Sequence, residues 1–85
     1  MNNDLEYRRK RLRFRAWHRG TKEVDLLLGP FADTNLDGLD EAGLASFEAL
    51  LACSDLEIMD WVIGAAEPPE NPVVARLVAS IPRAR

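Results

Sequence analysis

One short stretch, residues 18–25, carries charged side chains on both sides of a glycine. It reads "HRGTKEVD", which places Arg19 and Glu23 four positions apart, with Gly20 inside the interval and Asp25 just after it. A guanidinium offers a planar fork of donors that matches a carboxylate, and glycine lets another backbone come close. The stretch therefore suits recognition of a partner protein by a charged fork and a carboxylate.

A structural explanation of the same stretch stays open. Gly20 is a good residue for ending a helix, and Arg19 would then form an ion pair with Glu23 or Asp25 across the turn. Such an exposed pair contributes only about 0–1 kcal/mol to stability.

A second stretch, "DTNLDG" at residues 33–38, has the spacing of the first half of a calcium-binding loop. If Asp33 were position 1 of that loop, position 12, which needs a bidentate Glu, would be Leu44. Asp, Asn and Gly are also common in turns and helix caps. We therefore expect a connector after the second helix with solvated carboxylates, and no metal site.

Enzymatic chemistry has few candidate residues. The only histidine is His18 and the only cysteine is Cys53, and neither lies in a nucleophile or metal-ligand motif. A glycine-rich phosphate loop is also missing. We expect no catalytic residue, no metal and no stably bound cofactor.

The charge of the chain is strongly segregated. Residues 1–19 carry seven basic and two acidic side chains, a net charge of +5, whereas residues 20–85 carry four basic and twelve acidic, a net charge of −8. Arg and Lys beside Phe14 and Trp17 could bind nucleic acid or an anionic surface. We favour an amphipathic helix whose aromatic side chains enter the core, because the acidic remainder would repel a polyanion.

The bulk properties indicate one small globular domain spanning residues 1–85, with an ordered core at about residues 5–82. The longest apolar runs, such as "LLL" at 26–28, are far below the ~20 residues that cross a bilayer. One cysteine cannot form an internal disulfide. We expect a cytoplasmic bacterial protein without membrane insertion, and a monomer.

The hydrophobic spacing and the helix caps predict an all-α fold, a small bundle of five helices. The expected helices cover about residues 4–17, 21–32, 40–51, 54–64 and 71–81. Three starts are marked by capping residues, namely Asp40, Ser54 with Glu57, and Asn71 before Pro72. Short connections between helices favour antiparallel neighbours.

The sequence also resembles a known family over about residues 8–82. "RGTKEVDLLLGPF" is similar to the R-G-x-x-E region of the SdhE-type flavinylation factors of succinate dehydrogenase. The likeness continues through the pattern from Leu39 to Cys53, the segment "SDLEIMDWVIG" at 54–64 and the proline-containing link to the last helix. His18 and Thr21 depart from the residues that many members carry at these positions.

The resemblance implies a five-helix assembly factor without a catalytic site. Such a chaperone binds the flavoprotein subunit of succinate dehydrogenase, or of fumarate reductase, and promotes covalent attachment of FAD to a histidine of that subunit. FAD then belongs to the partner, and no nucleic acid is expected. The implied partner-binding residues are Arg15, His18, Arg19, Gly20, Glu23 and Asp25. The alternative is a helical regulatory module that uses its basic first helix on nucleic acid or an anionic surface.

Overall fold

A computed structural model describes residues 3–81, and within this range the chain forms five α-helices, a short 3₁₀-helix and no strand. The prediction of an all-α five-helix bundle is confirmed. The elements are α1 (Asn3–Trp17), α2 (Lys22–Asn35), η1 (Leu36–Gly38), α3 (Glu41–Leu51), α4 (Asp55–Ile63) and α5 (Pro72–Ser80).

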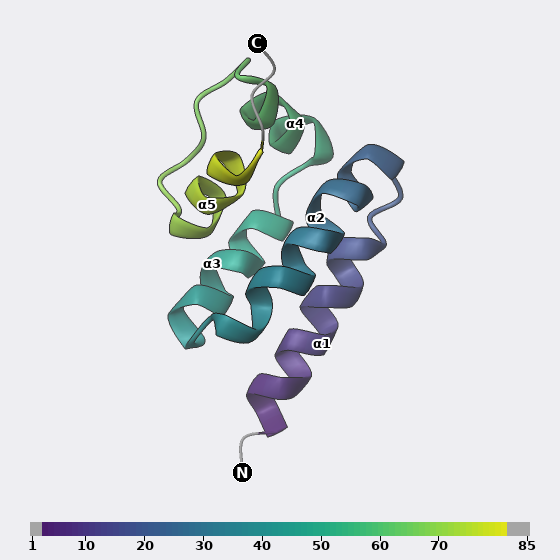
Figure 1. The fold of residues 1–85 in the computed structure, drawn as a ribbon, viewed down its shortest axis with the longest axis vertical. Helices are drawn as coiled ribbons and strands as arrows, with labels where there is room; N and C mark the ends of the chain where they lie inside the picture. The colour runs from purple at the N-terminus through teal and green to yellow at the C-terminus, as the bar shows by residue number, and fades with distance from the viewer. Residues whose placement is uncertain (1–2, 82–85) are drawn as a thin grey trace.

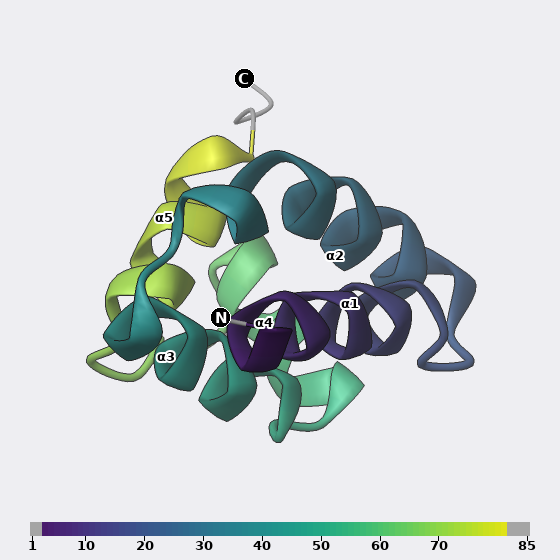
Figure 2. The same cartoon turned by 90° about the horizontal axis from the view of Figure 1, so that it is seen from below.

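The other helices pack around the pair formed by α1 and α2. The four residues 18–21 join α1 to α2, so these two helices lie side by side in opposite directions (Figure 1). Helix α3 packs against α1, α5 packs against α3, and α4 contacts α2. Figure 2 shows the same bundle from below, with α3 and α5 on one side of the α1–α2 pair. The joint between α3 and α4 thus comes close to the α1–α2 turn.

The apolar faces of the helices meet in one core. Phe31 of α2 and Phe47 of α3 stack there with ring centroids 6.0 Å apart. Side chains at helical spacing supply the rest, as expected for helices with one apolar face. The fully buried larger side chains are Leu12, Val24, Leu28, Leu36, Leu44, Phe47, Leu50, Ile58, Val74 and Leu77.

The three expected helix caps are present. The Asp40 carboxylate accepts a hydrogen bond from the Gly43 backbone N–H at 2.9 Å. Ser54 and Glu57 form the reciprocal capping box. The Asn71 side chain accepts from the first amides of α5. These interactions satisfy helix-end donors that have no partner within the helix, which is why the residue types marked the starts correctly.

The end of α2 corrects one expectation. Residues 33–38 are not an irregular connector, because α2 continues to Asn35 and η1 follows without a break. The Asn35 side-chain amide donates to the Phe31 carbonyl at 2.9 Å, which satisfies a carbonyl near the helix end. Pro30 lies inside α2 and has no backbone N–H to donate to the carbonyl of Leu26, a residue that is 58% exposed.

The two aromatic residues of α1 differ in burial. Trp17 is half-buried on α2, where its indole N–H donates to Asp33 at 3.3 Å. Phe14 is 63% exposed, so the expectation that both aromatic side chains enter the core is wrong for Phe14. The reason is its position in the helix, because Leu12 and Ala16 already fill the buried side of α1.

Candidate functional site

The turn between α1 and α2 is built around a glycine in the left-handed region. Gly20 has φ +103°, which L-residues with a side chain rarely adopt. A β-carbon added there would meet no heavy atom of the described residues within 4 Å. Gly20 is therefore required by backbone conformation, and its outer side is open to an approaching surface.

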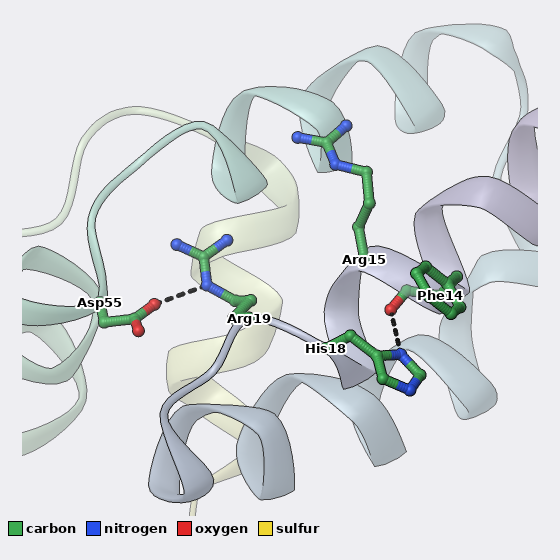
Figure 3. A pocket seen from close by; sticks show the side chains of 5 residues that line it. All are labelled: Phe14, Arg15, His18, Arg19 and Asp55. Carbon is green, nitrogen blue, oxygen red and sulfur yellow. Dashed lines mark hydrogen bonds and ion pairs between the residues drawn. The ribbon is translucent and has the colours of Figure 1, made fainter.

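The Arg19 side chain turns back into the protein. Its Nε donates to Asp55 at 2.6 Å, and its Nη1 donates to the Leu51 carbonyl at 2.8 Å. Its Nη2 donates to the Cys53 carbonyl. The side chain is only 14% exposed, and Figure 3 shows its pairing with Asp55. Arg19 thus ties the α1–α2 turn to the joint between α3 and α4.

Asp55 accepts from both ends of the turn. Besides Arg19, it accepts a hydrogen bond from the Thr21 hydroxyl at 2.5 Å. Asp55 is also the first residue of α4, where a carboxylate is favoured by the helix dipole. The Thr21 hydrogen bond, together with the hydrogen bond and charge of Arg19, lowers the pKa of the Asp55 carboxyl against the opposing effect of burial. The carboxylate is therefore held ionised.

The two acidic residues of the motif have different roles. Asp25 is half-buried and accepts a hydrogen bond from the Arg19 backbone N–H at 2.8 Å. Glu23 is exposed on the first turn of α2, and its side chain makes no hydrogen bond or ion pair with residues 3–81. The expected ion pair of the Arg19 side chain with Glu23 or Asp25 is wrong, because the guanidinium reaches Asp55 instead.

An open pocket of about 440 Å³ lies beside Arg19. Its lining residues are Phe14, Arg15, His18, Arg19 and Asp55. His18 stacks on Phe14 with ring centroids 4.1 Å apart, and its Nδ1 lies 2.8 Å from the Phe14 carbonyl, which it reaches as a donor. Figure 3 shows Arg15 extending away from the Arg19–Asp55 pair. Arg15 and His18 are thus exposed neighbours of the turn.

The structure brings together most of the expected site and adds two residues to it. Arg19 and Gly20 lie in the α1–α2 turn, and Asp25 of α2 binds the Arg19 backbone there, whereas Glu23 is exposed to solvent. Asp55 and Thr21 were not expected to take part. Asp55 stands near the start of the "SDLEIMDWVIG" segment, and this position could have marked it as a site residue. However, an acidic residue directly after a capping serine is common in the first turn of a helix, so its type alone did not indicate a special role.

The described residues give little support for a metal site, a membrane-spanning helix or a reactive thiol. Residues 3–81 contain no group of three or more His, Cys, Asp or Glu side chains that could hold a metal ion. Asp33 of the suspected calcium loop is instead bound by Arg13 at 3.0 Å. No helix within the same residues is long and apolar enough to cross a membrane. Burial raises the pKa of the Cys53 thiol, which disfavours the reactive thiolate.

Comparison with known proteins gives consistent matches. The family described as the flavinator of succinate dehydrogenase matches residues 10–85. The FAD assembly factor SdhE of Acetobacter pasteurianus is 40% identical over an alignment of 79 residues that covers 89% of this chain and 72% of that protein. The corresponding factor of Pseudomonas aeruginosa is 39% identical over 67 residues, covering 76% and 79%. The mitochondrial succinate dehydrogenase assembly factor 2 of Dictyostelium discoideum is 40% identical over 69 residues, covering 81% and 49%. No solved structure matches.

Proposed function

The chain belongs to the family of succinate dehydrogenase flavinators, and we propose that it is an assembly factor that binds the flavoprotein subunit of succinate dehydrogenase and promotes covalent attachment of FAD to it. The relatives named as FAD assembly factors support the cofactor of this proposal. The family description and the relative named as a succinate dehydrogenase assembly factor support the partner.

One observation carries the assignment to particular residues. The α1–α2 turn is fixed from inside by Arg19, Thr21 and Asp55, while its outer side presents bare backbone at Gly20 and an uncommitted carboxylate at Glu23. A fixed surface loses little conformational entropy when it binds a partner. We assign Glu23 and the Gly20 backbone to direct contact, and Arg19 and Asp25 to positioning.

The proposed mechanism is preferential binding of one conformation of the flavoprotein. Covalent attachment requires that the flavin ring and its acceptor histidine stay in a reactive geometry. An assembly factor that binds this conformation more tightly than others increases its population. The residues of this chain then hold the partner and transfer no group themselves, so we propose that it is not an enzyme.

The remaining features of the proposal follow from the same role. FAD stays with the flavoprotein, and the flavoprotein of fumarate reductase is a second candidate client. We propose that the factor acts in the bacterial cytoplasm, which the bacterial relatives and the lack of a possible internal disulfide support. We propose further that it acts as a monomer.

The test is co-expression of the chain with the succinate dehydrogenase flavoprotein, followed by in-gel fluorescence of covalent flavin. The variant Glu23→Gln removes one exposed charge and keeps the side-chain shape. We expect about tenfold weaker client binding, because a charge-assisted hydrogen bond becomes a neutral one, and a lower flavin yield when the factor is limiting.

Glu67→Gln is the matched control, since Glu67 is also exposed but lies in the loop after α4. It should leave the flavin yield at the wild-type level. Equal yields with wild type, Glu23→Gln and an empty vector would reject the proposed function. Equal yields with wild type and Glu23→Gln alone would reject only the role of Glu23.

A further inference from the structure

The outward face of α1 carries an exposed row of aromatic and basic side chains. Tyr7, Arg11, Phe14 and His18 follow one another at helical spacings of four, three and four, and we call these four residues the α1 stripe. Tyr7 and Phe14 are both 63% exposed. The eleven intervals from Tyr7 to His18 correspond to a length of about 16 Å.

The side chains of the α1 stripe are already ordered against one another. The Arg11 guanidinium carbon lies 5.9 Å from the centroid of the Tyr7 ring. The His18 ring stacks on Phe14 at an interplanar angle of 21°, and its Nδ1 contacts the Phe14 carbonyl. Side chains that are held before binding lose less entropy on binding, so this arrangement is suited to recognition.

Four of the seven basic side chains in residues 1–19 already bind other groups of the protein. Those that donate to carboxylates or carbonyls of other elements are Arg8, Arg9, Arg13 and Arg19. The other three, Lys10, Arg11 and Arg15, are exposed and make no hydrogen bond or ion pair with any residue in the range 3–81. All three lie on or beside the α1 stripe, which therefore carries the excess positive charge.

The α1–α2 turn alone has too little surface area to form a stable protein interface. A stable interface buries about 800 Å² on each partner, roughly one seventh of the surface of this chain; that surface is 5576 Å². Residues 20–23 are too few to supply that area. The α1 stripe ends at His18, directly before Arg19, so it extends the proposed contact surface without interruption.

On the basis of the proposed function, we propose that the α1 stripe, with Lys10 and Arg15, docks on an acidic surface of the flavoprotein client. That surface should have apolar hollows for Tyr7 and Phe14, and carboxylates opposite the three basic side chains. Aromatic residues and Arg dominate the binding energy of protein interfaces. Nucleic acid fits less well, because its charge continues along its whole length and would also meet the acidic remainder, residues 20–85 with a net charge of −8. An acidic patch on a protein can be confined to the area opposite the α1 stripe.

The first experiment measures the affinity of the full chain for the purified flavoprotein subunit without covalent flavin, using calorimetry. Phe14→Ala should weaken binding about tenfold, because it removes a central aromatic anchor. The matched control is Ile63→Ala, since Ile63 is 67% exposed but lies on α4. We expect a change below about twofold for this control.

The second experiment tests the charge. Reversal of all three basic residues, Lys10→Glu with Arg11→Glu and Arg15→Glu, should reduce the association rate about 10- to 100-fold at low salt. The rate of the wild type should fall steeply with ionic strength, and that of the variant should not. Circular dichroism checks that both variants keep the helical fold, which is expected because every substituted side chain is exposed.

Glu23→Gln in the same assays separates the two proposals. If it weakens binding while Phe14→Ala and the charge reversal bind like wild type, the docking role of the α1 stripe is overturned and the proposed function stands. If the wild type does not bind the flavoprotein, the proposed function fails and the docking role fails with it. Tighter binding of the wild type to a 20-base-pair duplex or to phosphatidylglycerol vesicles than to the flavoprotein would overturn the choice of a protein partner.

Discussion

Asp55 holds the residues on both sides of Gly20 in place, although it lies 36 positions after Arg19 and 34 positions after Thr21. Its carboxylate accepts from the Arg19 guanidinium and from the Thr21 hydroxyl, so it binds the residues on both sides of the glycine. In the R-G-x-x-E motif, Arg19 therefore points into the protein, Gly20 provides a left-handed backbone conformation, and Glu23 is exposed to solvent. Asp55 is a positioning residue for Gly20 and Glu23.

The first prediction concerns the pH dependence of Asp55→Asn. The folded pKa of Asp55 lies below its unfolded value of about 3.9, so its contribution to stability is present above that value and is lost as pH falls through the folded pKa. We expect Asp55→Asn to be less stable than wild type by about 1–2 kcal/mol at pH 7. The difference should shrink towards pH 2. Urea unfolding followed by tryptophan fluorescence measures it, and a constant difference across this range would contradict the prediction.

The second prediction separates conformation from contact at Gly20. Gly64 also has a positive φ, +82°, and a β-carbon on either glycine would have no described heavy atom within 4 Å. Gly20→Ala and Gly64→Ala should each lower stability by about 1–2 kcal/mol through backbone strain. Only Gly20→Ala should also weaken binding of the flavoprotein, as measured by calorimetry at a temperature where both variants are folded. An equal loss of binding for both would show that Gly20 has no contact role.

At the scale of elements, α1 and α2 approach each other closely where Trp17 meets Gly29. A β-carbon on Gly29 would lie only 2.3 Å from Cδ2 of the indole, so only glycine lets the ring lie flat on α2. The indole N–H and the Arg13 guanidinium both donate to Asp33 one turn further along. This contact sets the spacing of the two helices that carry the candidate site.

The third prediction tests this contact. Gly29→Ala should displace Trp17 and lower stability by about 1–3 kcal/mol, because the added methyl group cannot be accommodated without movement. The tryptophan emission should shift to longer wavelength as the half-buried indole becomes solvated. Gly38→Ala is the matched control, since a β-carbon there meets no described heavy atom within 4 Å. A wild-type spectrum together with wild-type stability for Gly29→Ala would contradict the prediction.

The helices were predictable where their signals are local. Asp40, Ser54 with Glu57, and Asn71 bind amides within three residues of themselves, so their identity alone marked the starts of α3, α4 and α5. The end of α2 was missed because "DTNLDG" has the composition of a turn, whereas Asn35 bonds back to Phe31 and prolongs the helix.

The candidate site was predictable only in part, because its interactions join distant parts of the sequence. Arg19, Gly20 and Glu23 were recognisable from their spacing and from the resemblance. The direction of the Arg19 side chain depends on how α4 packs beside α2, and no local pattern reports that. The exposure of Phe14 was missed for a related reason, since it depends on which side of α1 faces the bundle.

In the whole molecule, the Arg19 network joins the α1–α2 pair to the region formed by α3 and α4. Arg19 donates to the Leu51 carbonyl at the end of α3, to the Cys53 carbonyl in the joint between α3 and α4, and to Asp55, the first residue of α4. Exposed charges on α1 and α2, such as Lys10, Arg15 and Glu23, lie outside this network. The inner ion pair therefore serves the arrangement of the helices, and the outer charges remain available to a partner.

The fourth prediction is that Arg19 and Asp55 act as one unit. Removing either side chain leaves the other partly buried without its hydrogen-bond partner. The double variant should therefore lose less stability than the sum of the two single variants. A double-mutant cycle of Arg19→Ala and Asp55→Ala in urea unfolding should give a coupling of about 1–3 kcal/mol. The exposed pair of Arg13 and Asp33, with side chains 34% and 49% exposed, provides the control cycle. Its coupling should stay below about 1 kcal/mol, because solvent screens both charges. If the Arg19 and Asp55 losses add without coupling, the inner ion pair does not hold the turn, and Glu23 and Gly20 must be positioned by α1 and α2 alone.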